Sequence, residues 1–253
     1  METYSEKIRN MIEEMKLQSF DIEHSRVFGG GFLPNGQLLL CDNSLKKCIV
    51  YGDDGSIVQE IPLPGAPWDA FFESDGRILI TIPEKNTIVV LQQNTLAIEK
   101  TLPLSCDCKG ISKWQDKYLI GTWGKIVEFS TDFRHLTSRE LDITDDIAVD
   151  NDGCIVYGNY KNSTIIKEDL NHKVIFTYKQ EKLEKTCGLA FDNNGFIFVN
   201  GRQSNNIHIL SADGNLLKII DINEPRCIKF DKNSQRMFVV NSKGIVKMFQ
   251  IMW

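Results

Sequence analysis

The chain has 253 residues, of which 42% are hydrophobic and 25% are charged, and its formal net charge is −5. This length suits one large all-β unit or two small domains. The acidic net charge excludes a bulk electrostatic attraction to nucleic acid, although it leaves room for a local basic surface. The apolar runs are strand-sized and the first residues are charged, so we expect no transmembrane helix, no secretory signal and a cytoplasmic location.

Residues 3–15 are predicted to form an amphipathic helix. Thr3 and Glu6 have the spacing of a capping box. Apolar residues follow at helical spacing, at Ile8, Met11, Ile12 and Met15. We therefore expect a helix and linker at 1–14 and the main domain at 15–253. The helix would pack on that domain or end a longer upstream coiled coil, which would make the native protein a dimer although the fragment is a monomer.

The rest of the chain repeats one hairpin pattern. In its clearest copy, at 189–200, two apolar runs flank Asp192-Asn193-Asn194-Gly195. Asn-Gly reaches positive φ at low cost and so closes a tight β-hairpin. The aligned turns are centred at Asn35, Asp75, Asp116, Asp152, Asn194 and Ser234. A period of about 40 residues built from short strands predicts a β-propeller, here with six blades.

Each repeat is expected to supply four strands, named a to d. In the fifth repeat they lie at 189–191, 196–200, 207–210 and 216–222. The outer strand of the third repeat is poorly marked, near 138–141. The sixth repeat supplies three strands, at 228–230, 236–240 and 245–251. A strand at 15–22 resembles 216–222, so we expect it to complete the last blade and remove the open sheet edges.

The seven cysteines do not predict a disulfide framework or a zinc site. Their number is odd, and they are scattered through the predicted strands. Cys106-Asp107-Cys108 lacks the two-residue gap of the usual zinc or redox motif. We expect reduced, mostly buried thiols, which behave as small apolar residues in a cytosolic protein.

The repeat consensus is a small residue, two apolar residues and Asp, a turn with Gly, an apolar strand, and then Asn or Lys shortly before an Ile-Val strand. The segments 147–167 and 189–210 carry it best. It resembles the NHL repeat at the C-terminal end of tripartite-motif (TRIM-NHL) ubiquitin ligases, over 15–253. A WD repeat is less similar, because Trp68-Asp69 occurs once and no Gly-His is present. The resemblance implies a recognition domain without catalytic residues, since the ligase chemistry of that family belongs to a RING domain.

Candidate ligand-binding residues lie on the face that carries the longer b–c and d–a connections. Counting back from each turn places one residue per blade at the mouth of the central channel: Phe28, Trp68, Lys109, Asp145, Cys187 and Arg226. The b–c loops add basic residues, among them Arg202, and the interleaved aromatic residues Trp123 and Tyr160. Trp68 is the best single anchor, because exposed Trp is enriched at binding hot spots. Packing between neighbouring blades is the alternative role of Trp68.

Three functions fit these residues. The first is a protein-binding module that selects substrates or partners for a ligase. The second is a module for single-stranded or stem-loop RNA, because basic residues with stacking aromatics are typical of such sites. The third is a metal-dependent lactonase or lyase, although the histidines show no ligand spacing and loop aspartates such as Asp69 and Asp146 are usually solvated. A solvated rim of mixed charge explains the same residues without a ligand. We expect no cofactor and no metal.

Overall fold

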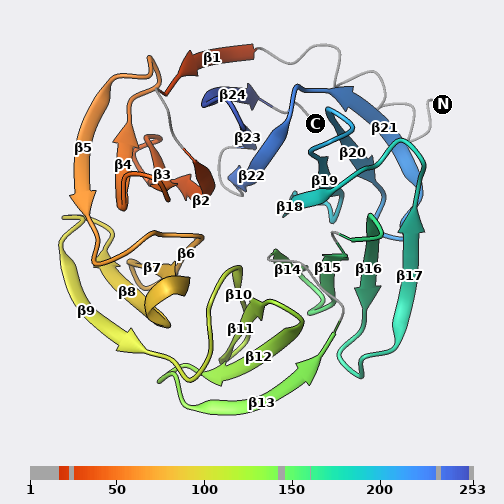
Figure 1. The fold of residues 1–253 in the computed structure, drawn as a ribbon, viewed down its shortest axis with the longest axis horizontal. Coiled ribbons are helices and arrows are strands. Elements are labelled where there is room, and N and C mark those ends of the chain that lie inside the picture. Colours follow the sequence, from red (N-terminus) through yellow and green to blue (C-terminus); the bar gives the residue numbers. More distant parts are fainter. Residues whose placement is uncertain (1–16, 23–25, 142–145, 160, 232–234, 251–253) are drawn as a thin grey trace.

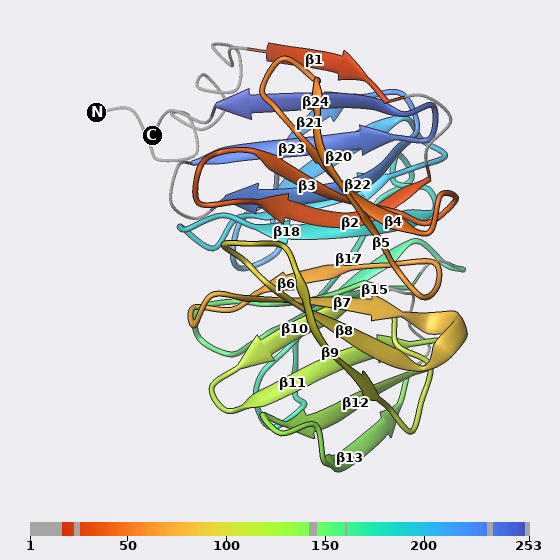
Figure 2. The same cartoon turned by 90° about the vertical axis from the view of Figure 1, so that its left-hand side faces the viewer.

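The computed structural model describes residues 17–22, 26–141, 146–159, 161–231 and 235–250. Viewed down its shortest axis, the chain forms six four-stranded sheets arranged around a common centre (Figure 1). The view from the side shows the sheets as the blades of a thick disk (Figure 2). The predicted all-β, six-bladed β-propeller is confirmed. Among the described residues, no helix is long and apolar enough to cross a membrane.

The first three blades follow each other in chain order, each with its first strand innermost. Blade I contains β2 (Val27–Phe32), β3 (Leu38–Asp42), β4 (Lys47–Tyr51) and β5 (Ile57–Pro62). Blade II contains β6 (Ala70–Phe72), β7 (Arg77–Ile82), β8 (Thr87–Gln92) and β9 (Ile98–Pro103), with the short 3-10 helix η2 (Pro83–Lys85) between β7 and β8. Blade III contains β10 (Ile111–Trp114), β11 (Lys117–Thr122), β12 (Lys125–Ser130) and β13 (His135–Glu140).

The last three blades complete the ring. Blade IV contains β14 (Ile147–Val149), β15 (Ile155–Asn159), β16 (Thr164–Glu168) and β17 (Val174–Lys179). Blade V contains β18 (Thr186–Phe191), β19 (Ile197–Gly201), β20 (Asn206–Leu210) and β21 (Leu216–Asp221). Blade VI contains β22 (Pro225–Asp231), β23 (Arg236–Asn241) and β24 (Ile245–Gln250), and β1 (Leu17–Asp21) pairs antiparallel with β24 as its outer strand. The helix predicted at 3–15 lies outside the described residues.

The core of the protein lies between the blades. Strands such as β3 and β19 are buried along their whole length, because both faces of each sheet pack against a neighbour. Their sequences are therefore almost continuously apolar rather than alternating. The outer strands differ: Ile57 in β5 is 58% exposed. Burying a leucine or isoleucine side chain contributes about 1.5–3 kcal/mol, so the repeated inner strands carry most of the stability.

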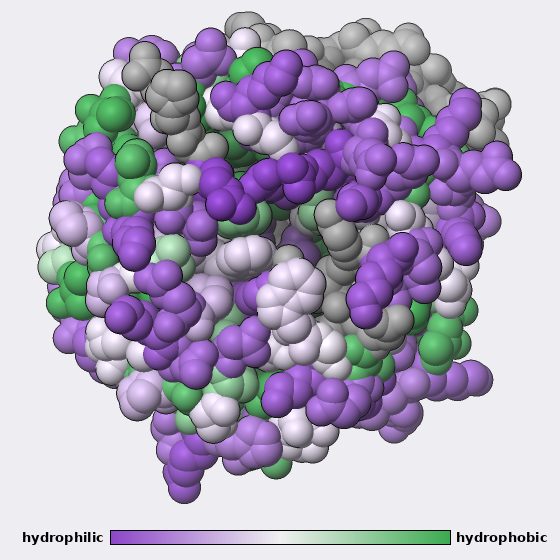
Figure 3. Space-filling model, in the orientation of Figure 1, coloured by the Kyte–Doolittle hydropathy of each residue, from purple (hydrophilic) through white to green (hydrophobic). Residues whose placement is uncertain are grey.

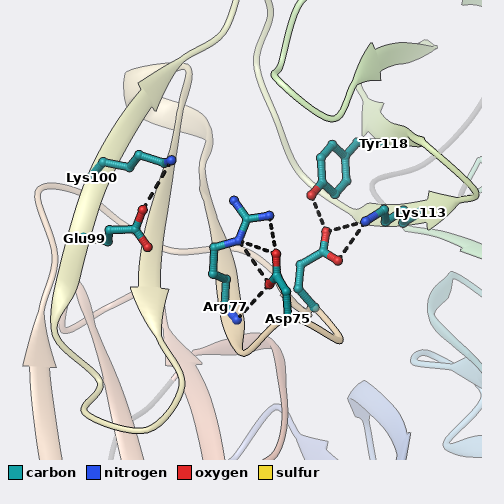
Figure 4. Close-up of polar contacts among 7 residues, drawn as sticks. Asp75, Arg77, Glu99, Lys100, Lys113 and Tyr118 are labelled. Atoms are coloured by element: carbon teal, nitrogen blue, oxygen red, sulfur yellow. Dashed lines mark hydrogen bonds and ion pairs between the residues drawn. The ribbon is translucent and has the colours of Figure 1, made fainter.

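Buried ion pairs join some neighbouring blades. Glu73, which follows β6, accepts hydrogen bonds from the Lys113 ammonium at 2.8 Å and from the Tyr118 hydroxyl (Figure 4). Arg139 of blade III lies 2.5 Å from Glu168 of blade IV. Burial and the nearby Glu73 carboxylate raise the pKa of Tyr118, so its hydroxyl stays protonated and donates. These contacts satisfy polar groups that the packing of the blades removes from water.

Some innermost strands are longer than the sequence pattern predicted. β18 begins at Thr186 rather than at 189, and its register shifts between Thr186 and Leu189. Gly188, at φ +77°, accommodates this bulge in a conformation that side chains with a Cβ rarely adopt. The prediction of buried free thiols is confirmed: all seven cysteines are free, and five are buried.

Phe20 gives a test of the N-terminal strand of blade VI. Its ring lies 5.7 Å from that of Tyr51 in the core between blades VI and I. Because the ring is partly buried, Phe20→Ala should lower the free energy of unfolding by roughly 1–3 kcal/mol. Gln18→Ala, at an exposed position of the same strand, should change it by less than about 0.5 kcal/mol. Urea denaturation measures both values. If Phe20→Ala changes the free energy of unfolding as little as Gln18→Ala is expected to, then the Phe20 ring contributes no packing energy.

Asp192 predicts a pH dependence of stability. Burial raises the pKa of this carboxyl to about 6, and its Oδ2 has no hydrogen-bond partner within the described part of the chain. The equivalent Asp150 of blade IV is instead paired with Lys167 at 2.9 Å. The folded protein holds the Asp192 proton more tightly than the unfolded chain does. The contribution of Asp192 to the free energy of unfolding should therefore be fully present below about pH 4 and be lost as the pH rises through about 6.

Asp192→Asn should remove this dependence. The amide oxygen can still accept from the Asn194 and Phe196 amides, as Asp192 Oδ1 does. At pH 8 the variant should be more stable than the original chain by on the order of 1–2 kcal/mol, and at pH 4 the difference should vanish. Urea denaturation at both pH values measures it. A variant that is less stable at pH 8 would contradict the raised pKa.

Candidate functional site

The b–c and d–a connections form one face of the disk, which Figure 3 shows from the front. Hydrophilic side chains cover much of this face, and pale residues of intermediate hydropathy surround its centre (Figure 3). We call the centre of this face, around which the innermost strands of the blades are arranged, the channel mouth. The predicted ligand-binding residues that the structure describes all lie on segments that reach this face.

Four of these residues form one contiguous array, which we call the aromatic–lysine array: Phe28, Trp68, Lys109 and Trp123. The Phe28 and Trp68 rings are stacked, with centroids 4.0 Å apart and planes 3° apart. Lys109 Nζ lies 4.5 Å from the centroid of Trp68 and 3.3 Å from that of Trp123. The lysine side chain is thus covered by two indoles from blades II and III. Each cation–π contact contributes about 0.5–2 kcal/mol, depending on its exposure.

Thr81 positions two members of this array. Its hydroxyl donates to the Lys109 carbonyl at 2.7 Å, and its backbone carbonyl accepts from the Trp68 amide at 2.9 Å. Gly29 allows the close approach of blades I and II, because a Cβ there would lie 2.4 Å from Asp69 Oδ1. The array is therefore held by the backbone beneath it. Trp68 packs between blades I and II, as the alternative role predicted, and it remains partly exposed.

An ion pair with a buried carboxylate lies near the array. Lys229 Nζ is 2.7 Å from Asp69 Oδ1, and Asp69 Oδ2 accepts from the Ile111 amide at 3.3 Å. Asp146 Oδ2 accepts from the Leu189 amide at 2.8 Å. Burial would lower the pKa of Lys229, but the carboxylates of Asp69 and Asp146 outweigh it and raise that pKa above its ordinary value. Lys229 therefore stays charged and links segments from several blades.

The other predicted residues have different surroundings. Arg226 lies against the array, with its guanidinium carbon 5.0 Å from the Phe28 centroid. Arg202 Nε donates to Ser242 Oγ at 3.2 Å. The half-buried Cys187 donates its thiol to the Pro225 carbonyl at 3.4 Å, so it has a packing contact there. Asp145 and Tyr160 lie outside the described residues.

The opposite face contains a cavity that the sequence did not predict. Its volume is about 850 Å³, and it lies between blades I and II among the short turns. Its lining is rich in amide side chains, which include Asn35, Gln59, Gln92, Gln93 and Asn94. The bidentate contact of Arg77 with Asp75 forms part of its wall (Figure 4). The run Gln92-Gln93-Asn94-Thr95 was the only sequence signal for this polar surface.

Metal-ligand geometry is not found in the described part of the chain, where no group of three or more His, Cys, Asp or Glu side chains could hold a metal ion. His208 is fully buried, and its ring contacts the Tyr178 hydroxyl at 2.7 Å. Burial lowers the pKa of His208, so the neutral imidazole is favoured. Its contacts make this histidine part of the core.

Comparisons with known proteins support the fold. No protein-family model matches the sequence, and no curated protein matches it. Among solved structures, a streptogramin B lyase has a TM-score of 0.68 and 16% identity, covering 94% of this chain and 88% of that one.

Two further structures give the same result. An inactive virginiamycin B lyase from Staphylococcus aureus with quinupristin has a TM-score of 0.67 and 16% identity, over 94% of this chain and 89% of that one. The Cps50 (Swd1) β-propeller domain of Myceliophteria thermophila has a TM-score of 0.68 and 11% identity, over 90% and 83%. At these identities the likeness establishes the β-propeller fold alone.

Lys229→Met should destabilise the protein strongly. It leaves the buried Asp69 carboxylate without its cation, and breaking such a pair costs roughly 3–5 kcal/mol. The double variant Lys229→Met/Asp69→Asn should recover part of this loss. Lys117→Met is the control, because the Lys117–Glu128 pair is 51% exposed on the lysine side and should contribute less than about 1 kcal/mol. Thermal unfolding that ranks Lys117→Met with Lys229→Met would contradict a structural role for the buried pair.

Proposed function

We propose that this chain is a non-enzymatic recognition domain that binds a protein partner through the face of the b–c and d–a connections. The aromatic–lysine array carries this proposal. Trp123 is 64% exposed, although its indole contacts a buried lysine. Rigid, exposed indoles held by a fixed scaffold are typical of binding hot spots. A solvated rim of mixed charge does not account for an array in which Phe28, Trp68, Lys109 and Trp123 contact one another in sequence across three blades.

The finer assignment rests on the repeat pattern at 147–167 and 189–210. We propose that the chain resembles the NHL domains of TRIM-NHL proteins in role as well as in pattern, and selects a substrate or partner for a cytoplasmic ubiquitin ligase. The ligase chemistry would then belong to another domain, and this propeller would supply affinity and specificity only. Its stiffness suits that role, because a preformed surface loses little entropy on binding.

RNA is the second candidate ligand. Arg202, Arg226 and the exposed Trp123 favour it, because single-stranded RNA is bound by cationic groups and stacking aromatics. The rest of the face favours protein. Lys46 lies 3.4 Å from Glu84, so that basic residue is paired with a carboxylate on the same face. An interrupted positive surface fits a shaped partner better than a chain of phosphates.

Trp123→Ala tests the proposed face. Peptides would first be selected from a random display library on the original chain, and their affinities measured by fluorescence anisotropy. Truncating a central indole should weaken binding by about tenfold or more. The melting temperature should fall by no more than a few degrees, because the side chain is mostly exposed and loses one cation–π contact with Lys109. Leu170→Ala is the matched control, because Leu170 is 54% exposed and lies in a c–d turn of the opposite face.

Two results would contradict the proposal. Peptides that bind both variants as tightly as the original chain would place recognition elsewhere. Binding of random single-stranded RNA at low salt, with an affinity that falls steeply as salt rises, would favour the RNA candidate if no peptide is selected.

A further inference from the structure

Three arginines converge beside the aromatic–lysine array. Arg26 precedes β2, Arg202 follows β19, and Arg226 lies in β22, so they come from blades I, V and VI. Arg202 Nε and Arg226 Nη2 both donate to Ser242 Oγ, at 3.2 and 3.4 Å. The guanidinium carbons of Arg26 and Arg226 lie 5.6 and 5.0 Å from the Phe28 centroid. We call Arg26, Arg202 and Arg226 the arginine cluster.

The cluster differs from the other arginines of the described chain. Each of those others forms an ion pair with a carboxylate: Arg77 with Asp75, Arg134 with Asp132, Arg139 with Glu168, and Arg236 with Asp53. Within the described residues, no ion pair joins a member of the arginine cluster to a carboxylate. Three cationic groups thus gather at one place, and among the described residues Glu224 is the carboxylate that acts on Arg226, without an ion pair to it.

The surroundings of Arg226 disfavour its charged guanidinium. Burial and the charges of Arg202 and Arg26 lower the pKa of its guanidinium. Its Nε is buried, and no acceptor lies within hydrogen-bond reach among the described residues. In neighbouring β18 and β19, the Thr186 hydroxyl and the Asn200 amide are also buried without partners. Buried polar groups are normally hydrogen-bonded, so the described residues leave several polar groups unsatisfied directly beneath the arginine cluster.

From this geometry we infer that the arginine cluster binds a carboxylate, and that the carboxylate is an Asp or Glu side chain of the protein partner. Guanidinium groups bind planar carboxylates through paired N–H donors, and three such groups converge here. The second half of the inference rests on the proposed function. An acidic residue at the cluster would place its neighbours over Phe28 and Trp68, with Trp123 further along the array. The recognised segment would therefore combine an acid with an apolar or aromatic residue.

A carboxylate fits this site better than an RNA strand. The cluster is confined to one sector of the mouth, and it is continued by the stacked rings of Phe28 and Trp68, beyond which Lys109 is covered by two indoles. The carboxylates nearest to the channel, Asp69 and Asp146, already have partners in Lys229 and the Leu189 amide. One or two negative charges would neutralise the cluster, whereas a strand would need a longer positive surface.

The anion site can be tested without any partner. Arginine Nε–Hε signals would be followed by NMR while sodium acetate replaces sodium chloride at constant ionic strength. We expect the Arg226 and Arg202 signals to shift saturably, and Arg202→Gln to weaken acetate binding several-fold. Arg134→Gln makes the same charge change on the exposed Arg134, whose side chain is 83% exposed, and should leave binding unchanged. Signals that do not saturate would overturn the site. Inorganic phosphate that binds at least about tenfold more tightly than acetate would overturn the carboxylate assignment.

The library peptides test the acidic partner on the intact chain. Selected peptides should share an Asp or Glu, and its change to Asn or Gln should weaken binding by about tenfold or more. Arg202→Glu should reverse the preference and select Lys or Arg at that position. The thermal stability of Arg202→Gln should be no lower than that of the original chain, because one unneutralised charge is removed. This separates lost binding from lost folding.

The outcomes separate this inference from the proposed function. Peptides that depend on Trp123 but have no acid preference would overturn the inference and leave the proposed function standing. If acetate binds but no peptide is selected, the proposal of a protein partner is contradicted and only the anion site is supported. A short single-stranded RNA that displaces acetate and binds more tightly than any selected peptide would replace the acidic peptide with RNA.

Discussion

The buried contact between Lys229 and Asp69 fixes the geometry on which the rest of the channel mouth depends. Asp69 is bonded at once to Lys229 of blade VI and to the Ile111 amide of blade III. Trp68 precedes it directly, and Thr81 holds the backbone of both residues. A shift of Asp69 would therefore move Trp68, and with it the stack on Phe28. A propeller whose blades share few covalent links needs such contacts to keep loops from different blades in register.

The charges of the channel mouth fall into two classes with different consequences. The positive charge of Lys229 is balanced by the carboxylates of Asp69 and Asp146, and their contacts help to fix the positions of the blades. The arginine cluster has no ion pair with a carboxylate within the described residues, and burial together with the charges of Arg202 and Arg26 lowers the pKa of Arg226. An arrangement that costs stability in the free protein is typical of a functional site. This contrast is why the arginines, rather than the lysine, are assigned to a ligand.

The sequence predicted the blades because each hairpin repeat is specified by neighbouring residues. It could not predict the geometry of the site, because the site is formed by residues from different blades. Turns such as Asp192-Asn193-Asn194-Gly195 specify a hairpin from four adjacent residues. The stack of Phe28 on Trp68 joins residues about 40 positions apart in different blades, and hydrophobic periodicity has no information on ring orientation. Counting back from the turns did place these residues at the mouth. It gave neither the bulge at Gly188 nor the amide-lined cavity, since both depend on how neighbouring sheets pack.

Closure of the ring also assembles the arginine cluster. β1 pairs with β24, and the Ile22 amide donates to the Gly244 carbonyl at 2.8 Å. This contact anchors the chain close to Arg26, on the blade that also carries Arg226. Arg26 contacts the ring of Phe28, two residues further along the chain, and Arg226 from the last blade contacts the same ring. The site therefore combines residues from both ends of the propeller with Arg202 of blade V. In this propeller, the junction that closes the ring thus lies beside the proposed arginine site.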